Sequence, residues 1–159
     1  PDDRQAQIEV TTQGGERRGV GIRCGASTGY YFFVRCDNTS QTGFLTRVNN
    51  ANTDITTLQS FTGVTVATSD TMEIQITGQD GSIVIKCLVN GTQVNTDYTP
   101  SSGNYINTGQ PGVYAETQGS DALRLDNFSF DDLIVASSTA KLLLQKNNLG
   151  TALMNGIIS

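Results

Sequence analysis

The residue types in this chain limit the chemistry that it can carry out. There is no histidine, so an imidazole base, a Ser-His-Asp triad and a His-ligated metal are all excluded. The three cysteines, Cys24, Cys36 and Cys87, stand in separate expected strands and do not form a zinc motif. Asp131 and Asp132 are adjacent at a strand end, where a solvated turn is a more usual role than an acid–base pair. The sequence therefore predicts a protein that is not an enzyme.

Binding is the chemistry that remains, and its best candidates lie at residues 30–36, Tyr-Tyr-Phe-Phe-Val-Arg-Cys. Four aromatic residues follow one another there, in a chain with five Tyr, six Phe and no Trp. Side chains alternate between the two faces of a strand, which puts one set on the face shared with Val20 and Ile22: Tyr30, Phe32, Val34 and Cys36. We expect this first set to be core.

The second set, Tyr31, Phe33 and Arg35, must then project from the other face of the sheet. We expect three further side chains near it: Arg47, Leu45 and Lys86. Outward rings beside cations have three uses: to stack on sugar rings, to be covered by a loop or the tail, or to form a subunit contact. The candidate carbohydrate- or partner-binding residues are thus Tyr31, Phe33, Arg35 and Arg47.

The elements that position these residues are predicted to be strands. Charged residues make up only 16% of the chain and apolar ones 36%, with abundant Thr, Ser, Asn and Gly. Apolar and polar residues alternate from Ile8 onward in about nine short segments separated by Gly and Asn turns, and 95–110 reads as a long loop. The pattern predicts an all-β protein in which two antiparallel sheets pack face to face.

Residues 71–94 are predicted to form a three-stranded meander. A turn centred on Gln79 and Asp80 would pair Ile76 with Ile83, Ile74 with Ile85 and Met72 with Cys87, so that all six share one apolar face. Asn90-Gly91 is the favoured pair for a two-residue type I′ turn, which would bring Val94 opposite Cys87.

A Cys24–Cys36 disulfide is disfavoured by the hairpin expected around residues 25–29. Cys24 would lie beside Tyr30 at the turn and Cys36 at the far end, roughly 20 Å away at about 3.3 Å per residue. We expect three free, buried thiols.

The net charge of −5 and the lack of any basic stripe argue against binding to nucleic acid or to anionic lipid. No apolar run reaches the length of a membrane span.

We expect one domain at 1–136 and a C-terminal extension at 137–159, since the tail from residue 139 is Leu-rich and Thr-poor. The tail either docks on the domain or forms an arm that packs on a neighbouring subunit.

The order of several short segments resembles the concanavalin A-like lectin and glucanase superfamily, and within it the laminin-G-like jelly-roll domains of bacterial extracellular and phage virion proteins. The segments are 19–22, 29–34, 45–48, 69–74, the hairpin 78–89 with Val-Asn-Gly-Thr at 89–92, 109–113 and Leu-Asp-Asn-Phe at 125–128. The resemblance covers residues 5–135. Such domains usually begin with a further segment before the position of Gln5, so the chain is expected to be part of a longer polypeptide or to lack an edge strand.

The resemblance implies a concave sheet, with ligands bound on its face or in the loops at one rim. We expect no cofactor; the one that the resemblance allows is calcium, at Asp54 with Asn50 and Asn52 or at Asp97 with Asn95, although Asn-rich loops usually serve turn geometry. Asp126 and Asn127 are expected to fix a strand end by hydrogen bonding rather than to bind calcium.

Many enzymes of this superfamily carry Glu-x-Asp-x-Glu on one strand, whereas the nearest row here, Glu73-x-Gln75-x-Thr77, holds a single carboxylate. Two functions follow. The first is a virion structural, decoration or tail-fibre adhesion module, located at a virion surface or outside the cell. Such a module would form homo-oligomers and pack on neighbouring virion or surface subunits, with glycans as a further ligand in some cases. The alternative is a carbohydrate-binding module of a secreted bacterial protein or enzyme. The Leu-rich tail and the lack of Trp favour the first.

Overall fold

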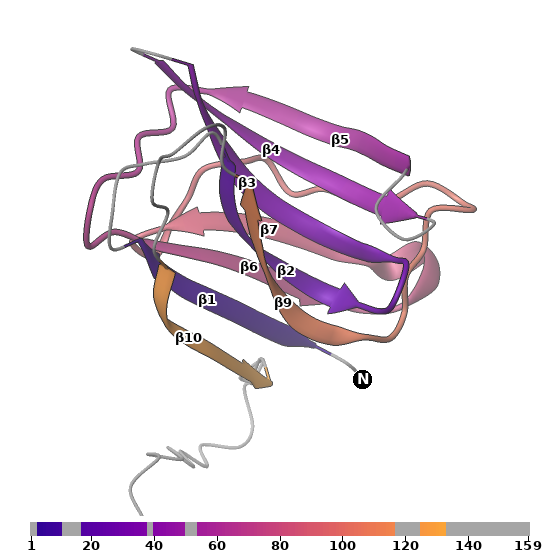
Figure 1. Ribbon diagram of the computed structural model, residues 1–159. Helices are drawn as coiled ribbons and strands as arrows, with labels where there is room; N and C mark the ends of the chain where they lie inside the picture. The colour runs from indigo at the N-terminus through magenta and orange to yellow at the C-terminus, as the bar shows by residue number, and fades with distance from the viewer. Residues whose placement is uncertain (1–2, 11–16, 38–39, 50–53, 117–124, 133–159) are drawn as a thin grey trace, which may run out of the picture.

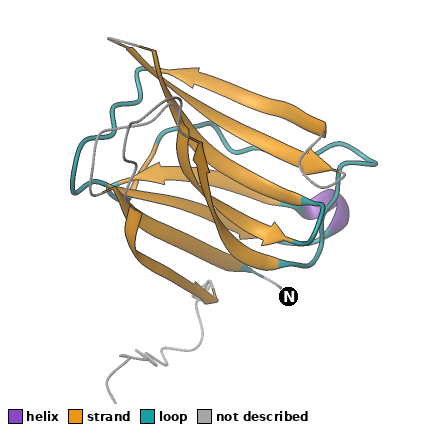
Figure 2. Cartoon of the chain, viewed as in Figure 1, coloured by secondary structure: helices purple, strands orange, loops and turns teal. Residues whose placement is uncertain are grey.

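The computed structural model describes residues 3–10, 17–37, 40–49, 54–116 and 125–132, which form two five-stranded antiparallel sheets stacked as a sandwich (Figure 1). The helical content of these residues is one short 3-10 turn, η1 (Asp80–Ser82), drawn in purple in Figure 2. No helix among the described residues is long and apolar enough to cross a membrane. The all-β, two-sheet prediction is confirmed.

The first sheet, called sheet A, has the strand order β10-β1-β6-β7-β8. Its strands are β1 (Arg4–Val10), β6 (Thr71–Thr77), β7 (Val84–Val89), β8 (Thr92–Gln93) and β10 (Leu125–Asp132). Sheet B has the order β5-β4-β3-β2-β9. Its strands are β2 (Arg17–Cys24), β3 (Gly29–Asp37), β4 (Ser40–Asn49), β5 (Asp54–Thr62) and β9 (Gln110–Glu116). Consecutive strands change sheet four times, after β1, β5, β8 and β9, as in a jelly roll.

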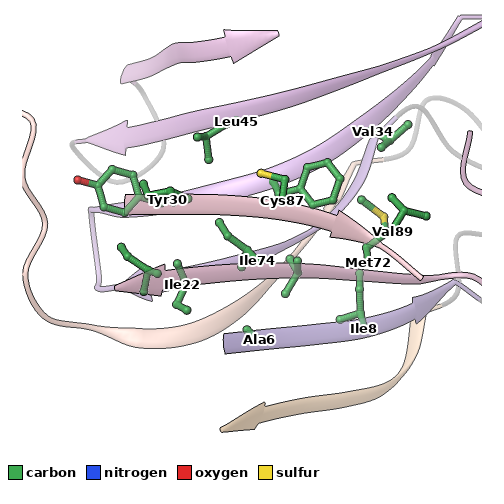
Figure 3. Close-up of a cluster of buried hydrophobic side chains, with 14 of the residues drawn as sticks. Ala6, Ile8, Ile22, Tyr30, Val34, Leu45, Met72, Ile74, Cys87 and Val89 are labelled. Carbon is green, nitrogen blue, oxygen red and sulfur yellow. The ribbon is translucent and has the colours of Figure 1, made fainter. Parts of the chain in front are cut away.

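The core lies between the sheets and is built by alternation within each strand (Figure 3). Sheet A contributes Ile8, Met72, Ile74 and Cys87, and sheet B contributes Val20, Ile22, Tyr30, Phe32, Val34 and Leu45, all fully buried. The predicted inward set of β3 is therefore confirmed for Tyr30, Phe32 and Val34, whereas the side chain of Cys36 lies outside the described part of the chain.

The β6–β7 hairpin forms as predicted, but its register differs by two residues. Ile76 pairs with Ile85, Ile74 with Cys87 and Met72 with Val89. The turn is longer than the sequence suggested because η1 follows Gly78 and Gln79. A shift of two leaves every side chain on its predicted face.

The β7–β8 turn agrees with the prediction. Asn90 and Gly91 both have positive φ, 50° and 73°, as a type I′ turn requires. The Val94 amide donates to the Cys87 carbonyl at 2.9 Å, which places these two residues opposite each other.

The end of β2 departs from simple alternation. Arg23 has a φ of 51°, and the β2–β9 register shifts between Gly21 and Cys24. This irregularity turns Arg23 inward, where it is buried and donates to the carbonyls of Ile106 (3.0 Å) and Gly78 (2.6 Å). Cys24 is consequently half-buried on the outer face, and the prediction that its thiol is buried is wrong. It is nevertheless a free thiol, as is the buried Cys87.

The predicted long loop between β8 and β9 is fastened to the core by Tyr30. The Tyr30 hydroxyl donates to the Asn104 carbonyl at 2.6 Å and accepts from the Ile106 amide at 3.0 Å. A second buried arginine, Arg18, donates to the Val66 carbonyl at 2.8 Å and so holds the segment between β5 and β6. Loops at the sandwich ends are thus held by polar side chains that reach through the core.

At the edge of sheet A, Asp126 and Asn127 shape β10 as expected. The Asn127 amide donates to Asp126 Oδ1 at 2.7 Å, its side chain donates to Glu9 Oε2, and its φ is 49° where the β1–β10 register shifts. Asp132 pairs with Arg4 on β1, with 3.7 Å between Oδ1 and Nε, so it is a strand residue rather than part of a turn. The predicted extension 137–159 lies outside the described residues.

Candidate functional site

The outer face of sheet B carries a row of aromatic residues that crosses four strands. Phe44 on β4 is the register partner of Phe33 on β3, Phe33 is the partner of Gly19 on β2, and Gly19 is the partner of Tyr114 on β9. Directly opposed residues of antiparallel strands project to the same side, so these positions form one line across the sheet (the strands are labelled in Figure 1).

Because Gly19 has no side chain, the aromatic rings on either side of β2 can contact each other. A Cβ built at Gly19 would lie 2.6 Å from Cα and Cβ of Phe33, so the space above β2 is filled by the neighbouring strand's residue. The rings of Phe33 and Tyr114 therefore meet across β2, with centroids 5.2 Å apart and an interplanar angle of 23°. On its other side Phe33 stacks on Phe44, again at 5.2 Å and with an angle of 21°.

Tyr31 extends this cluster at the β9 side. Its ring lies 5.7 Å from Tyr114 at an angle of 59°, and a Cβ built at Gly21 would contact it at 2.6 Å. Burial raises the pKa of the Tyr31 hydroxyl, and its hydrogen bond with Cys24 raises it further. Burial also raises the pKa of the Cys24 thiol. Both groups are therefore neutral at physiological pH, and this end of the cluster is packing rather than a reactive site.

Two arginines lie over the rings. Arg17 on β2 and Arg35 on β3 are direct register partners, and Arg17 is also the backbone partner of Glu116 on β9. The Arg17 Cζ atom lies 5.7 Å from the Phe33 centroid, and the Arg35 Cζ atom lies 5.4 Å from the Phe44 centroid. Both contacts are within the range of cation–π interactions.

These residues line a groove of about 260 Å³ that opens to solvent on the outer face of sheet B. Its lining comes from four adjacent strands: Arg17, Phe33, Arg35, Phe44, Thr46, Ile55 and Thr57. Phe33 is only 6% exposed, so it forms the floor rather than an open platform. Phe44 is half-buried, and Ile55 and Thr57 are exposed. The groove therefore combines one accessible ring, an aliphatic side chain, a hydroxyl and two guanidinium groups.

The four candidate residues divide as follows. Phe33 and Arg35 line the groove, Tyr31 lies beside it in the same ring cluster, and Arg47 does not join them. Arg47 is the register partner of the core residue Tyr30, and it donates to Asn104 Oδ1 at 3.0 Å at the loop end of the sandwich.

The two other neighbours expected around the outward rings are also elsewhere. Leu45 is fully buried in the core opposite Phe32, and Lys86 is on β7 of the other sheet. The β3–β4 pairing puts Leu45 and Arg47 on the inner side of the sheet, and the prediction that they lie near the outward rings is wrong.

The side-chain oxygens that were suggested as calcium ligands accept hydrogen bonds from the protein at the sites that the structure describes. Asn95 Oδ1 accepts from the Cys87 amide at 2.7 Å, and Asp97 Oδ1 accepts from Gln93 at 2.7 Å. No three His, Cys, Asp or Glu side chains gather into a possible metal site within the part of the chain that the structure describes. The other suggested group, at residues 50–54, has its side chains outside that part.

Sequence reasoning missed Arg17, Phe44, Ile55 and Tyr114 as members of the site. Strand alternation could have placed Phe44 and Thr46 on one face of the sheet, because residues two apart in a strand project to the same side. The registers that bring Phe44 and Tyr114 to Phe33 depend on loop lengths and on the remote pairing of β9 with β2, which local patterns do not specify.

The fold and groove define a β-sandwich with a polar–aromatic site on one outer face. No protein-family model and no curated protein gives a significant match to the sequence. Among solved structures, the chain is similar to a carbohydrate-binding module, CBM66, from Bacillus subtilis. The TM-score is 0.58 at 15% identity, covering 82% of this chain and 76% of that chain. At this identity the similarity concerns the fold.

Proposed function

We propose that this chain is a non-catalytic glycan-binding module whose site is the groove on the outer face of sheet B. The observation that carries the proposal is the groove's lining, in which the accessible ring of Phe44 and the side chain of Ile55 lie beside the guanidinium of Arg35 and the hydroxyl of Thr57. Sugars are bound in this way, because the apolar face of a pyranose packs on a ring while polar neighbours bond its hydroxyls.

Phe33 has a supporting role in this proposal. Its ring is held between Phe44 and Tyr114, so it fixes the orientation of Phe44 without contacting ligand. A rigid platform loses little conformational entropy on binding, which favours affinity for a small ligand.

The fold similarity adds support, because the Bacillus subtilis protein is itself a carbohydrate-binding module. The lack of histidine in the sequence agrees with a binding rather than a catalytic role. The proposal places the chain outside the cell, and it assigns glycan binding to the sandwich within residues 1–136.

A glycan array tests the proposal. We expect specific binding that falls by about 5- to 30-fold in Phe44→Ala, since the lost stacking is worth about 1–2 kcal/mol. Phe128→Ala, an equal truncation on β10 of the other sheet, is the matched control and should leave binding unchanged. Absence of binding to the whole array, or equal loss in both variants, would contradict the proposal.

A second candidate function, a surface or virion module that assembles with copies of itself, is favoured by β10. Within the described residues β10 is an edge strand, and its Phe128 and Phe130 are 42% and 57% exposed with ring centroids 6.3 Å apart. An edge strand beside apolar side chains is suited to pairing with a second copy of the chain.

Sedimentation of the full chain over a range of concentrations tests this second function. It predicts a dimer or higher oligomer that dissociates in the double variant Phe128→Ser, Phe130→Ser. A wild-type chain that stays monomeric at all concentrations would contradict it.

A further inference from the structure

Three exposed apolar side chains lie on the two end strands at one side of the sandwich. β9 and β10 end sheets B and A there, beside β2 and β1, and β1 lies against both β2 and β9. Val113 on β9 is 45% exposed, although its register partner Val20 is in the core. Phe130 on β10 is exposed too, and its partner Ala6 is in the core. Directly opposed residues project to the same side, so Val113 and Phe130 face inward at an edge that neither sheet covers.

Phe128 and Phe130 form the larger part of this edge. Their ring centroids are 6.3 Å apart, and the two side chains lie on the same side of β10. Within the described residues β10 pairs with β1 alone, which leaves its other edge with unpaired N–H and C=O groups (Figure 1). An added strand would bond these groups, and apolar residues at its alternate positions would cover the two rings. The surface therefore has the form of an acceptor for one more strand.

The charge of β10 indicates which strand would fit. Its residues, all of them described, include Asp126, Asp131 and Asp132 and no Lys or Arg, and the three aspartates are exposed. In a full antiparallel overlap with a second β10, Asp126 of one copy would lie at Asp131 or Asp132 of the other. Like charges in opposed positions destabilise a strand pair. A basic strand is therefore favoured over a second copy of β10.

One segment of this chain has the matching charge pattern. Residues 140–146, Ala-Lys-Leu-Leu-Leu-Gln-Lys, contain two of the chain's three lysines with only Leu and Gln between them. In an antiparallel alignment Lys141 can lie opposite Asp131. The same alignment brings Lys146 to Asp126, because the two lysines and the two aspartates have the same separation in the sequence. Opposite charges in opposed positions stabilise strand pairing.

The same alignment also matches the apolar residues. It places Leu142 opposite Phe130 and Leu144 opposite Phe128. Both leucines then point to the side of the exposed rings. Residues 133–139 connect the two segments, and they include Ser-Ser-Thr, which favours a turn. Charge, apolar pattern and connection thus agree on one register.

We propose that residues 140–146 pair with the free edge of β10 in the same chain, as an antiparallel strand with Leu142 and Leu144 against the two rings. The short link 133–139 gives the segment an effective concentration of about millimolar at β10, far above that of a second molecule in dilute solution. The inference is independent of the glycan groove, which is on sheet B. It competes with the second candidate function, because both use the free edge of β10.

Carbodiimide coupling of the full chain tests the pairing, since the reagent joins a carboxylate to a neighbouring amine with loss of water. We expect an amide between Lys141 and Asp131, found by mass spectrometry of the digested protein. Lys86 and Asp97, with 3.8 Å between Nζ and Oδ2, provide the positive control for the reaction. An equal mixture of isotope-labelled and unlabelled protein shows whether the joined residues belong to one chain.

Two serine variants test the apolar contacts. The register predicts that Leu142 faces the rings and that its neighbour Leu143 faces the other side, so the same substitution at each gives a matched pair. Leu142→Ser should accelerate hydrogen exchange of the β10 amides by about tenfold, because it removes the cover of Phe130. Leu143→Ser should leave exchange at β10 unchanged. The amides of β6 are the internal reference, because global unfolding would accelerate them as well.

The outcomes separate the proposal from its alternatives. Coupling of Lys141 to β10 only between labelled and unlabelled chains would overturn it and support pairing with a second copy. Failure of Lys141 to couple while Lys86 and Asp97 couple would also overturn it, as would equal exchange rates in the two serine variants. Each of these results leaves the proposed glycan function untouched, since the groove takes no part in the test.

Discussion

At Gly19 the backbone of β2 passes directly beneath the ring row of sheet B. Alanine there would place a methyl group 2.6 Å from Cα and Cβ of Phe33 and against the Phe32 carbonyl oxygen. We predict that Gly19→Ala lowers the free energy of unfolding by about 1–3 kcal/mol, the usual cost of overpacking. It should also weaken glycan binding, because Tyr114 can no longer support Phe33.

Thermal unfolding measures the loss of stability in Gly19→Ala, and the glycan array measures the loss of binding. Gly25→Ala, in the following turn, is a suitable control because its nearest atom, Thr28 Oγ1, is 3.4 Å away, an ordinary contact. Equal stability of the two variants would contradict the close packing of β2 against β3.

We predict that the buried thiol of Cys87 makes the free energy of unfolding fall at alkaline pH. Burial raises the pKa of its thiol above the ordinary value of 9.0. Above about pH 9 the thiol ionises in the unfolded chain but stays protonated in the folded one, so the unfolded state binds fewer protons and stability falls as pH rises. The slope contributed by one thiol is about 1.4 kcal/mol per pH unit.

Urea unfolding between about pH 8 and 10 in Cys87→Ala tests this prediction. The variant should be less stable at pH 8 but show a shallower decline than the wild type. Cys24, whose pKa is also raised, stays in both proteins, so the difference in slope belongs to Cys87. Parallel declines would contradict the prediction.

The loop between β8 and β9 is attached to the core by one hydroxyl group, that of Tyr30. Tyr30→Phe would leave the Ile106 amide and the Asn104 carbonyl without their buried partner, at a cost of about 1–3 kcal/mol. Hydrogen exchange at the Ile106 amide should accelerate accordingly. Tyr105→Phe, in the same loop, is the control because the Tyr105 hydroxyl makes no hydrogen bond within the described residues, and its exchange pattern should match the wild type.

Strand alternation predicted much of the architecture at this scale. It assigned Tyr30, Phe32 and Val34 to the core, and it gave the correct face to each residue of the β6–β7 hairpin. It failed at Cys24 because the positive φ of Arg23 interrupts the period of two. Alternation holds only while the backbone stays extended, and nothing in the local sequence marked Arg23 as an exception.

Across the whole molecule, two of the seven residues that line the groove could be predicted from the sequence. Phe33 and Arg35 could be predicted because they belong to one strand, and the face of a residue is a local property. Arg17, Phe44 and Ile55 come from three other strands, and their approach depends on registers that loops and the sheet order determine. The misplaced Arg47 has the same cause, since its face depends on the pairing of β4 with β3.

Mapping the bound ligand on the folded protein tests directly where the glycan site lies. Amide chemical shifts would be recorded while the best-binding oligosaccharide from the array is added. Binding in the groove predicts changes confined to the strand segments around Arg17, Phe33, Phe44 and Thr57. Changes confined to the loop 95–109, or to sheet A, would contradict a glycan site on the outer face of sheet B.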